Sequence, residues 1–515
     1  MLQKPCAANG RISPQKTTKE IRDETRMDGF CAGRGCGRRR GSQPLTADSS
    51  TFKERFPLQY ERWIASAADN QTEDMIAREP YQVILRAGTG GPAGPRLLGL
   101  RGHFYSYLDF ATIPDAGIPS KADPYASNDC LLCHSSVAAD AIRKEGEREF
   151  ESSHWVKYAH LGPQPVGCVN CHDPKTMKLA LAPTWIDAVR KSQGKPPFAQ
   201  SSSAEQKSLV CGQCHSRRWA RRIPWKDEAG RDRQNKVSFA HWASGYSLAE
   251  MEAYYNDGSN FPSGKPSVDF VHPISRAPLI MSVHPDYELF QTGIHARAGA
   301  ACTDCHMPKI TYKGQKVTDH FITRPLKNFD VSCTSCHDAS KKDVLVSEAR
   351  RMKERAQALR DKTGWALAKA HLEAGEAWKR GATADEMKTA LADIRASYFR
   401  FNSLGRGNWF HAPQETLHEL ADALNQAQSA RLEIRRVLAR HGAADYEAPE
   451  FSNKQQALAL LNLPQQKAAV IEKCASNARD LPAYKAQAVK ARHWSKDFDI
   501  PEGTESWTTR ECRKP

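Results

Sequence analysis

The sequence predicts a mainly α-helical protein with two parts of different character. Five copies of the pattern Cys-x-x-Cys-His lie between residues 130 and 337 of the 515-residue chain. The segments between them are rich in Pro, Gly, Ser and Lys and show few strand-like alternations. After residue 340 the chain is dense in Ala, Glu, Lys, Arg and Leu, which favour helix. We therefore expect short helices and loops first and long helices afterwards.

The five motifs have the spacing of c-type haem attachment sites. Two cysteines three residues apart lie about one helical turn from each other, so both thiols can reach one porphyrin while the adjacent imidazole points at its iron. A zinc site would need a second pair of ligands and would not explain the histidine. The sequence thus predicts a redox protein with five covalent c-type haems that form much of its core. The haem-attaching cysteines are Cys130, Cys133, Cys168, Cys171, Cys211, Cys214, Cys302, Cys305, Cys333 and Cys336, and the proximal ligands are His134, His172, His215, His306 and His337.

Four helices are predicted after the last motif. Residues 343–380 form one long helix that ends at Gly381. Thr383 and Glu386 form a capping box that opens a second helix toward Leu404. Pro413 marks the start of a third helix, which stops at Gly442. A fourth helix is expected from about residue 452 to residue 475.

These patterns divide the chain into four segments. Residues 51–340 are expected to form the pentahaem-binding domain and residues 341–490 a helical region, followed by a tail at 491–515. The long helices suit a bundle, a partner-binding face, a dimer interface or a cap packed on the haem domain, and their pattern does not choose among these. Residues 1–50 are expected to be a disordered or misassigned leader, because they show no apolar export segment.

Composition limits the classes of partner. The formal net charge is +15, but two propionates on each of five haems offset much of it. The remaining basic surface suits an anionic substrate or an acidic partner, and no nucleic-acid-binding motif accompanies it. The mean hydropathy is −0.63 and no apolar run approaches the roughly 18 residues of a membrane span, so we expect a soluble protein. Bacterial c-type haem is attached outside the cytoplasmic membrane, which predicts a periplasmic location.

Several stretches resemble the ammonia-forming cytochrome c nitrite reductases, across the order and spacing of all five motifs. The resemblance implies a periplasmic enzyme that reduces nitrite to ammonium with six electrons at haem 1, while haems 2 to 5 conduct electrons. It also implies a homodimer joined through the long C-terminal helices, and a donor that is either a membrane quinol-oxidising cytochrome or a soluble cytochrome. The matching stretches are HPDYELFQTGIHARAGAACTDCHMPK from His284, TDH from Thr318, RGHFY from Arg101, LVCGQCH from Leu209, MEAYY from Met251 and HAP from His411.

The second axial ligands of haems 2 to 5 follow only from this resemblance. Of 18 histidines, thirteen lie outside the motifs, and composition does not choose among them. By position, the resemblance implies His103 for haem 3, His320 for haem 2, His295 for haem 5 and His411 for haem 4.

The chain departs from the family pattern around haem 1. The family usually binds this haem through Cys-x-x-Cys-Lys, whereas His134 stands here, as in some members. The family's distal arginine corresponds to Asp115. After the third motif, Arg217 and Arg218 replace a calcium-binding glutamate and a catalytic tyrosine. The other calcium contacts fall on Met281 and Val283, so a calcium site is not expected, because neither side chain nor a guanidinium supplies hard oxygen ligands.

These departures leave several hypotheses open. An open iron site with His284 as proton donor and Arg218 or Arg217 as anion holder would sustain nitrite reduction. The same arginines could instead be solvent-facing charges. Asp115 could pair with Arg218 and close the pocket, or Met281 or His284 could become a sixth iron ligand, either of which would give an electron-transfer cytochrome. A third hypothesis keeps catalysis with another nitrogen or sulfur oxyanion as substrate.

Overall fold

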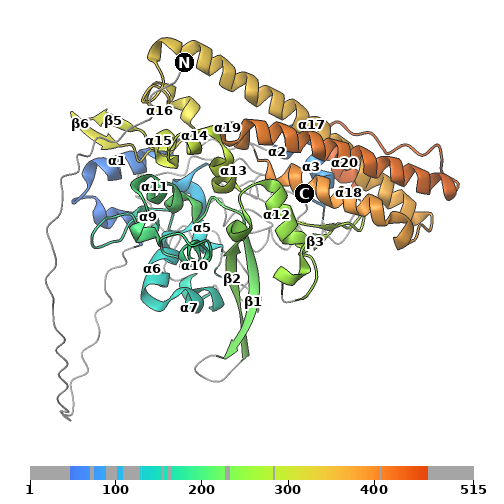
Figure 1. Cartoon of the computed structure of the whole chain (residues 1–515), viewed down its shortest axis with the longest axis horizontal. Coiled ribbons are helices and arrows are strands. Elements are labelled where there is room, and N and C mark those ends of the chain that lie inside the picture. The colour runs from blue at the N-terminus through green and yellow to red at the C-terminus, as the bar shows by residue number, and fades with distance from the viewer. Residues whose placement is uncertain are drawn as a thin grey trace.

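The computed structural model of the chain is mainly α-helical, which confirms the predicted fold class (Figure 1). The short helices that carry the motifs gather on one side, and the long C-terminal helices extend to the other. The predicted leader, apart from residues 47–50, and the tail at 491–515 lie outside the described residues. The structure describes residues 47–69, 75–87, 101–107, 128, 130–153, 156–159, 164–226, 232–261, 263–281, 285–405 and 407–461.

The motif-bearing side consists of short helices joined by turns and loops. Each motif lies on or beside one such helix, because only one helical turn is needed to present both thiols. The helices are α1 (Pro57–Ala65), α2 (Met75–Arg78), α3 (Tyr81–Leu85), α5 (Leu131–His134), α6 (Ser136–Glu145), α7 (Glu147–Ser152), α8 (Val156–Ala159), α9 (Cys168–Cys171), α10 (Trp185–Ser192), α11 (Ser203–Gly212), α12 (Leu248–Asn256), α13 (Asp286–Thr292), α14 (Ile294–Arg297), α15 (Cys302–His306) and α16 (Phe329–Ser332).

Strands are few in the part of the chain that the structure describes, as predicted. They form three separate antiparallel pairs, of which the β1–β2 ribbon is the longest and projects from the body (Figure 1). Its register pairs Arg218 with Ala240 and Lys226 with Asp232. The strands are β1 (Arg218–Lys226), β2 (Asp232–Ala240), β3 (Phe270–Val271), β4 (Pro278–Leu279), β5 (Lys309–Tyr312) and β6 (Gln315–Thr318).

The long helices begin and end close to the predicted positions. Thr383 caps α18 through the expected box, in which Thr383 Oγ1 accepts from the Glu386 N–H and the Glu386 carboxylate accepts from the Thr383 N–H. Gly381 follows α17 with φ +90°, a conformation that disfavours other residues. The predicted fourth helix is present as α21, and its expected continuation to residue 475 lies outside the described residues. The helices are α17 (Lys342–Lys379), α18 (Ala384–Ser403), α19 (Asn408–His411), α20 (Pro413–Arg440) and α21 (Lys454–Leu461).

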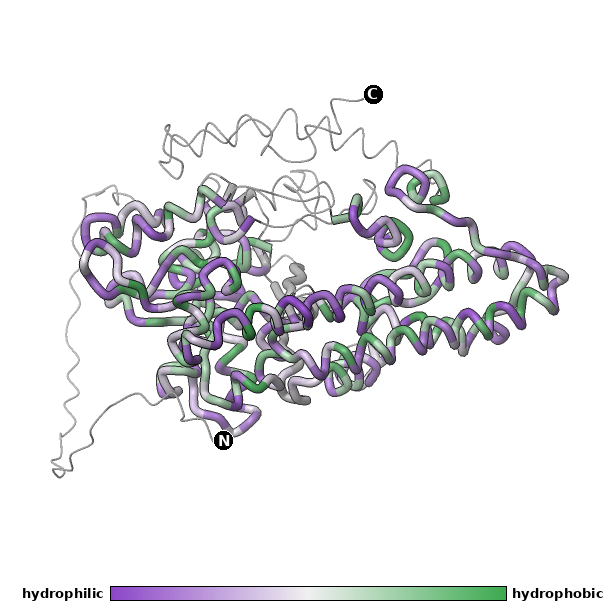
Figure 2. The backbone as a smooth tube through the Cα atoms, turned by 90° about the horizontal axis from the view of Figure 1, so that it is seen from above, coloured by the Kyte–Doolittle hydropathy of each residue, from purple (hydrophilic) through white to green (hydrophobic). Residues whose placement is uncertain are grey.

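The largest apolar core of the described residues lies among the long helices, where α17 and α18 pack against α20. Figure 2 shows hydrophobic and hydrophilic residues alternating along these helices, as expected of helices with one buried face. Many of the buried positions are alanines, which allow close packing of the backbones. The short helix α3 is fully part of this core through Val83, Ile84 and Leu85. It therefore ties the N-terminal part of the chain to the C-terminal helices.

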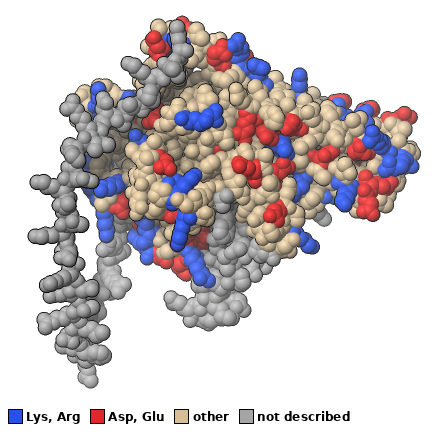
Figure 3. All heavy atoms as spheres, in the orientation of Figure 1, with Lys and Arg blue, Asp and Glu red and all other residues tan. Residues whose placement is uncertain are grey.

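The surface of the long helices is polar. Figure 3 shows Lys and Arg interspersed with Asp and Glu over their visible face. None of the helices within the described ranges is long and apolar enough to cross a membrane.

Candidate haem-binding and catalytic site

Each motif has the local geometry that its spacing predicts. The N–H of His172 donates to the Cys168 carbonyl at 3.0 Å, and those of His215 and His337 donate to the first cysteine of their motifs at 2.8 and 2.9 Å. This bond closes one helical turn, so the two cysteines and the histidine of a motif share one face. The ten motif cysteines are not joined in disulfides, and most are partly buried. Covalent attachment of one porphyrin per motif fits this arrangement.

The five motifs lie against one another in a continuous series. Asn170 of motif 2 donates to the carbonyl of Ser135, next to motif 1, at 3.2 Å, and Gln213 of motif 3 donates to the Asn170 carbonyl at 2.8 Å. Further contacts join motif 3 to motif 1 (Cys214 Sγ to Leu132 O, 3.5 Å), motif 3 to motif 4 (Cys302 N to Ser208 Oγ, 3.3 Å) and motif 4 to motif 5 (Ser332 Oγ to Cys305 O, 2.8 Å).

Four imidazole pairs are separated by nearly the same distance. The ring centroids lie 6.2 Å apart for His103 and His215, 6.3 Å for His172 and His320, 6.3 Å for His306 and His411, and 6.4 Å for His295 and His337. Two metal–nitrogen bonds of about 2 Å, plus about 1.1 Å from each nitrogen to its ring centroid, give about 6.2 Å. Each pair therefore leaves room for one iron atom, and the pairs are those that the resemblance implies for haems 3, 2, 4 and 5.

Another histidine pair lies too close together to hold an iron atom between its rings. His272 and His371 stack with their ring centroids only 3.8 Å apart, inside the core of the long helices. No iron fits between rings at van der Waals contact. The sequence patterns used above do not mark either residue.

Backbone carbonyls orient three of the paired imidazoles and also the imidazole of His134 in motif 1. Such a bond places a proton on Nδ1 and leaves Nε2 as the metal-binding nitrogen. Nδ1 lies 3.2 Å from Ser106 O for His134, 2.8 Å from Met177 O for His172, 3.1 Å from Thr323 O for His306 and 2.9 Å from Thr318 O for His320. Burial lowers the pKa of His103 and of His306 to about 4, so both are neutral and able to bind a metal at physiological pH.

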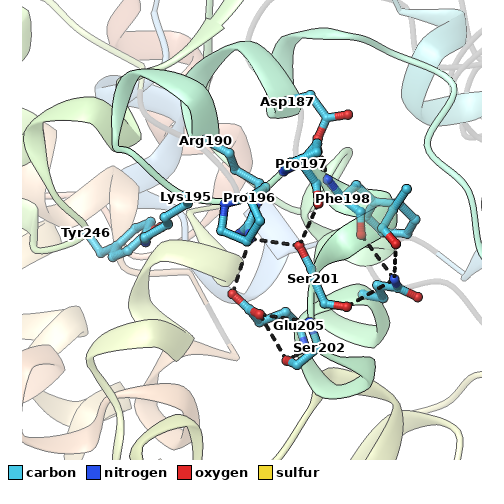
Figure 4. A network of polar contacts seen from close by, with 12 residues as sticks. Asp187, Arg190, Lys195, Pro196, Pro197, Phe198, Ser201, Ser202, Glu205 and Tyr246 are labelled. Carbon is cyan, nitrogen blue, oxygen red and sulfur yellow. Dashed lines mark hydrogen bonds and ion pairs between the residues drawn. The ribbon is translucent and has the colours of Figure 1, made fainter. Parts of the chain in front are cut away.

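A network of polar contacts, with the buried Arg190 at its centre, holds the helix that leads into motif 3 (Figure 4). The Arg190 guanidinium donates to Pro196 O and Ser201 Oγ, each at 2.8 Å, and to Glu205 at 3.3 Å. Glu205 also completes the capping box of α11 with Ser202. Because Cys211 lies on the last turn of α11, these contacts fix where motif 3 begins.

Arg217 is largely shielded from solvent. Its guanidinium is 2.9 Å from the Asp269 carboxylate and lies over the ring of Tyr255, with 12% of the side chain exposed. Its backbone N–H donates to Glu288 at 2.9 Å. The hypothesis of a solvent-facing charge is therefore wrong for Arg217. The structure instead gives this cation a fixed carboxylate partner.

Asp269 connects two positions at which the resemblance places calcium contacts. One oxygen, Oδ2, accepts from the Arg217 guanidinium at 2.9 Å and from the Met281 N–H at 2.7 Å. A cationic side chain thus lies against the carboxylate at this place. Among the described residues, no group of three or more His, Cys, Asp or Glu side chains could hold a metal ion.

The remaining catalytic candidates are only partly described. Arg218 begins β1, but its side chain lies outside the description, and His284, Asp115 and Val283 lie outside the described residues. The structure therefore does not place the predicted distal pocket of haem 1. The proximal side of haem 1 is described. The Nδ1 of His134 lies 3.2 Å from the Ser106 carbonyl oxygen, and the Ser106 hydroxyl donates to the His134 carbonyl at 3.0 Å.

Three carboxylates of this region were missed by sequence reasoning. Asp269 holds Arg217, Asp286 faces His215, and the fully buried Glu288 accepts from Trp242 Nε1 and the Arg217 N–H, both at 2.9 Å. Burial raises the pKa of Glu288 to about 8. Asp286 and Glu288 belong to the HPDYE stretch that carries the resemblance, but nothing in their spacing marked them as neighbours of motif 3.

Five attachment motifs, four imidazole pairs spaced for iron and a helical scaffold define a multihaem c-type cytochrome. The cytochrome c552 family model matches residues 48–492. The chain therefore belongs to the cytochrome c552 family, which confirms the resemblance drawn from its motifs and its class as an oxidoreductase.

Relatives span most of the chain. The cytochrome c-552 of Aliarcobacter butzleri is 35% identical over 421 residues, covering 80% of this chain and 81% of the relative. That of Desulfotalea psychrophila is 32% identical over 474 residues, covering 91% of each. Among solved structures, the cytochrome c nitrite reductase of Desulfovibrio desulfuricans is similar, with a TM-score of 0.69 and 23% identity over 83% of this chain and 96% of that one. At that identity the structural likeness shows the fold alone.

Proposed function

We propose that this protein is a pentahaem nitrite reductase that converts nitrite to ammonium at haem 1 and conducts electrons through haems 2 to 5. The observation that carries the proposal is the set of four imidazole pairs at iron-spanning distance, set beside a fifth motif with its own proximal histidine. Haems 2 to 5 are bound by His320 and His172, His103 and His215, His411 and His306, and His295 and His337. The contacts between successive motifs support a continuous electron path.

The roles of the protein groups at haem 1 follow from the reaction. The haem iron supplies the site that binds nitrite and delivers electrons to it. His134, oriented by the Ser106 carbonyl, is the proximal ligand. His284 donates protons to the oxygens that leave as water, and Arg218 holds the anion by charge and hydrogen bonding. Membership of the family and the motif order support these roles.

Arg217 does not hold the anionic substrate in this proposal. Because Asp269 holds its guanidinium and Tyr255 covers it, Arg217 is not available to reach a substrate. We assign it the part of an internal cation, which neutralises Asp269 beside motif 3 where relatives of the resembled type place calcium. The protein then needs no calcium. A guanidinium is permanently charged, so the arrangement does not depend on the metal supply.

The remaining assignments concern location and partners. The protein works in the periplasm, takes electrons from a quinol-oxidising or soluble cytochrome, and forms a homodimer through its long helices. The resemblance supports the dimer. Light scattering of the purified holoprotein tests this, and a mass of one chain at micromolar concentration would exclude the dimer.

The test of the proposed reaction is viologen-linked nitrite consumption, with ammonium measured, on protein whose mass confirms five haems. We expect stoichiometric ammonium. His284→Ala should lower the turnover number on the order of a hundredfold or more, as loss of a general acid does. No turnover by fully loaded protein with a six-coordinate, low-spin haem 1 would favour the electron-transfer alternative. Turnover of hydroxylamine or a sulfur oxyanion alone would favour another substrate.

The calcium assignment has its own test. Removal of divalent cations by a chelator should leave nitrite turnover and the spectrum unchanged, and metal analysis should find no stoichiometric calcium. Arg217→Gln leaves Asp269 without its cation, so this variant should be less stable than the wild type. Stoichiometric calcium in the native protein would overturn the assignment.

A further inference from the structure

The imidazole of His215 has a partner unlike those of the other described ligands. Its Nδ1 lies 3.4 Å from Oδ2 of Asp286, whereas the Nδ1 atoms of His134, His172 and His306 lie against backbone carbonyls. A carbonyl is a neutral acceptor, and a carboxylate carries a full negative charge. Among the five motif histidines, this charged contact is described only for haem 3.

The contact is fixed by the fold rather than by two mobile side chains. The Tyr287 N–H donates to the His215 carbonyl at 2.9 Å, which joins the start of α13 to the end of motif 3. Gly212, inside motif 3, lies so close to Tyr287 that an added Cβ would be 2.7 Å from the ring. Asp286 is therefore held beside His215 by a backbone bond on one side and close packing on the other. The Asp286 side chain is 26% exposed, and that of His215 is 52% exposed.

We propose that Asp286 is a positioning residue that lowers the reduction potential of haem 3 through its hydrogen bond with His215. The proposal rests on the proposed function, which makes His215 and His103 the axial ligands of haem 3. A carboxylate on Nδ1–H gives the imidazole more imidazolate character, which makes it a stronger donor. A stronger donor and a nearby negative charge both favour ferric over ferrous iron.

A lower reduction potential at haem 3 matters because motif 3 lies next to motif 1. Motif 3 contacts motif 1 directly, with Cys214 Sγ 3.5 Å from Leu132 O. A lower potential at haem 3 would favour electron transfer from haem 3 to haem 1 and would slow the return. Asp286 thus biases the last step of the electron path toward the catalytic haem.

Redox titration of the holoprotein tests the proposal, followed by visible spectra and by electron paramagnetic resonance of the low-spin haems. In Asp286→Asn, we expect one low-spin component to titrate at a higher potential and its g-values to change, because the neutral amide is a weaker acceptor. Asp286→Glu should restore the native behaviour at least in part. The components of haems 2 and 5, whose imidazoles do not contact Asp286, should stay within error of the wild type.

Asp304→Asn is the matched control. Asp304 is also a carboxylate in the haem region, but it accepts from the Ala301 N–H and not from an imidazole. If both variants shift the same components equally, the effect is a general loss of negative charge, and the proposal is overturned. It is also overturned if no component moves in Asp286→Asn.

These readouts separate the proposal from the proposed function. Haem potentials and g-values are measured without nitrite, so they remain informative even if the wild type does not reduce nitrite. Conversely, a wild type that makes ammonium, together with unchanged potentials in Asp286→Asn, removes the role of Asp286 and leaves the reaction assignment standing.

Discussion

The two sides of the molecule differ in what fills their interiors. The long helices share one large apolar core, in which α17 and α18 pack against α20 and α3 joins them. On the motif-bearing side the described apolar residues form several smaller, separate clusters, such as the one around Trp185 and Trp242 and the one around Trp63 and Phe104. Porphyrin faces fit between such clusters. This difference predicts that the long helices are stabilised by their own apolar core, whereas the motif-bearing side requires bound haem to fold.

Blocking haem attachment should break the molecule along this division. With serine at all ten motif cysteines, we expect the amides of α17, α18 and α20 to keep protection from hydrogen exchange, while those of α5 to α16 lose nearly all of theirs. Removing five haems leaves the smaller clusters without the surface that joins them. Hydrogen exchange with mass spectrometry measures this difference in one experiment.

The wild-type holoprotein is the control, and both sides should be protected in it. Equal protection of both sides in the variant without motif cysteines would mean that the motif-bearing side folds without haem. Loss of protection in both would mean that the core of the long helices depends on the haem side, with α3 as the first place to look.

Loss of a buried ion pair between two long helices is the next largest expected effect. Glu373 of α17 is fully buried and accepts from Arg431 of α20 at 2.7 Å. Arg431→Leu should lower the free energy of unfolding by up to about 3–5 kcal/mol, because it leaves the buried carboxylate with only the half-exposed Arg435, 3.6 Å away, as a partner. Replacing both residues by leucine should recover most of that loss. Denaturant unfolding of the holoproteins measures both changes.

The exposed pair of Lys369 and Glu450 is the control for this experiment. Its carboxylate is 76% exposed, so Lys369→Ala should change the stability by less than about 1 kcal/mol. If the double variant is no more stable than Arg431→Leu, the loss of stability comes from packing of the arginine side chain and not from the buried charge of Glu373.

The sequence predicted much of the helical side because its signals are local. The capping box at Thr383 and the glycines at 381 and 442 act within a few residues, and the helices begin and end where these signals lie. The five motifs are equally local. The haem-packed core was also expected, because the segments between the motifs are rich in Pro, Gly, Ser and Lys and show few strand-like alternations, and the small separate clusters agree with that expectation.

Contacts between distant residues could not be predicted from local pattern. His103 and His215 are brought together only by the tertiary fold, and the resemblance, not spacing, paired them. The carboxylate of Asp269 was missed because an aspartate 52 residues from Arg217 carries no local mark of its partner. The stacked pair of His272 and His371 was missed for the same reason.

That stacked pair predicts loss of stability in acid on the helical side. Burial lowers the pKa of His272 to about 4 and that of His371 well below its usual value of 6.5. Their contribution is complete above pH 6.5, where both states are neutral, and is lost as the pH falls from 6.5 toward 4, because only the unfolded chain takes up protons freely. We expect a loss of about 3 kcal/mol from His272 alone over this range, and His371 adds to it in the same direction. His371→Leu should reduce the slope of stability against pH, whereas replacing the exposed His418 by glutamine should not.

Titration of Glu288, beside motif 3, should give stability the opposite dependence on pH, and this is the smallest of the expected effects. Burial raises its pKa to about 8, well above the usual 4.5. The folded state therefore keeps a proton that the unfolded chain releases, and stability falls as the pH rises from 4.5 through 8. Between pH 7 and pH 9 the loss is about 1 kcal/mol. Glu288→Gln keeps the oxygen that accepts from Trp242 and Arg217 and should flatten this alkaline slope. Replacing the exposed Glu348 by glutamine should leave the slope as in the wild type. An unchanged slope in Glu288→Gln would place the alkaline titration on another group.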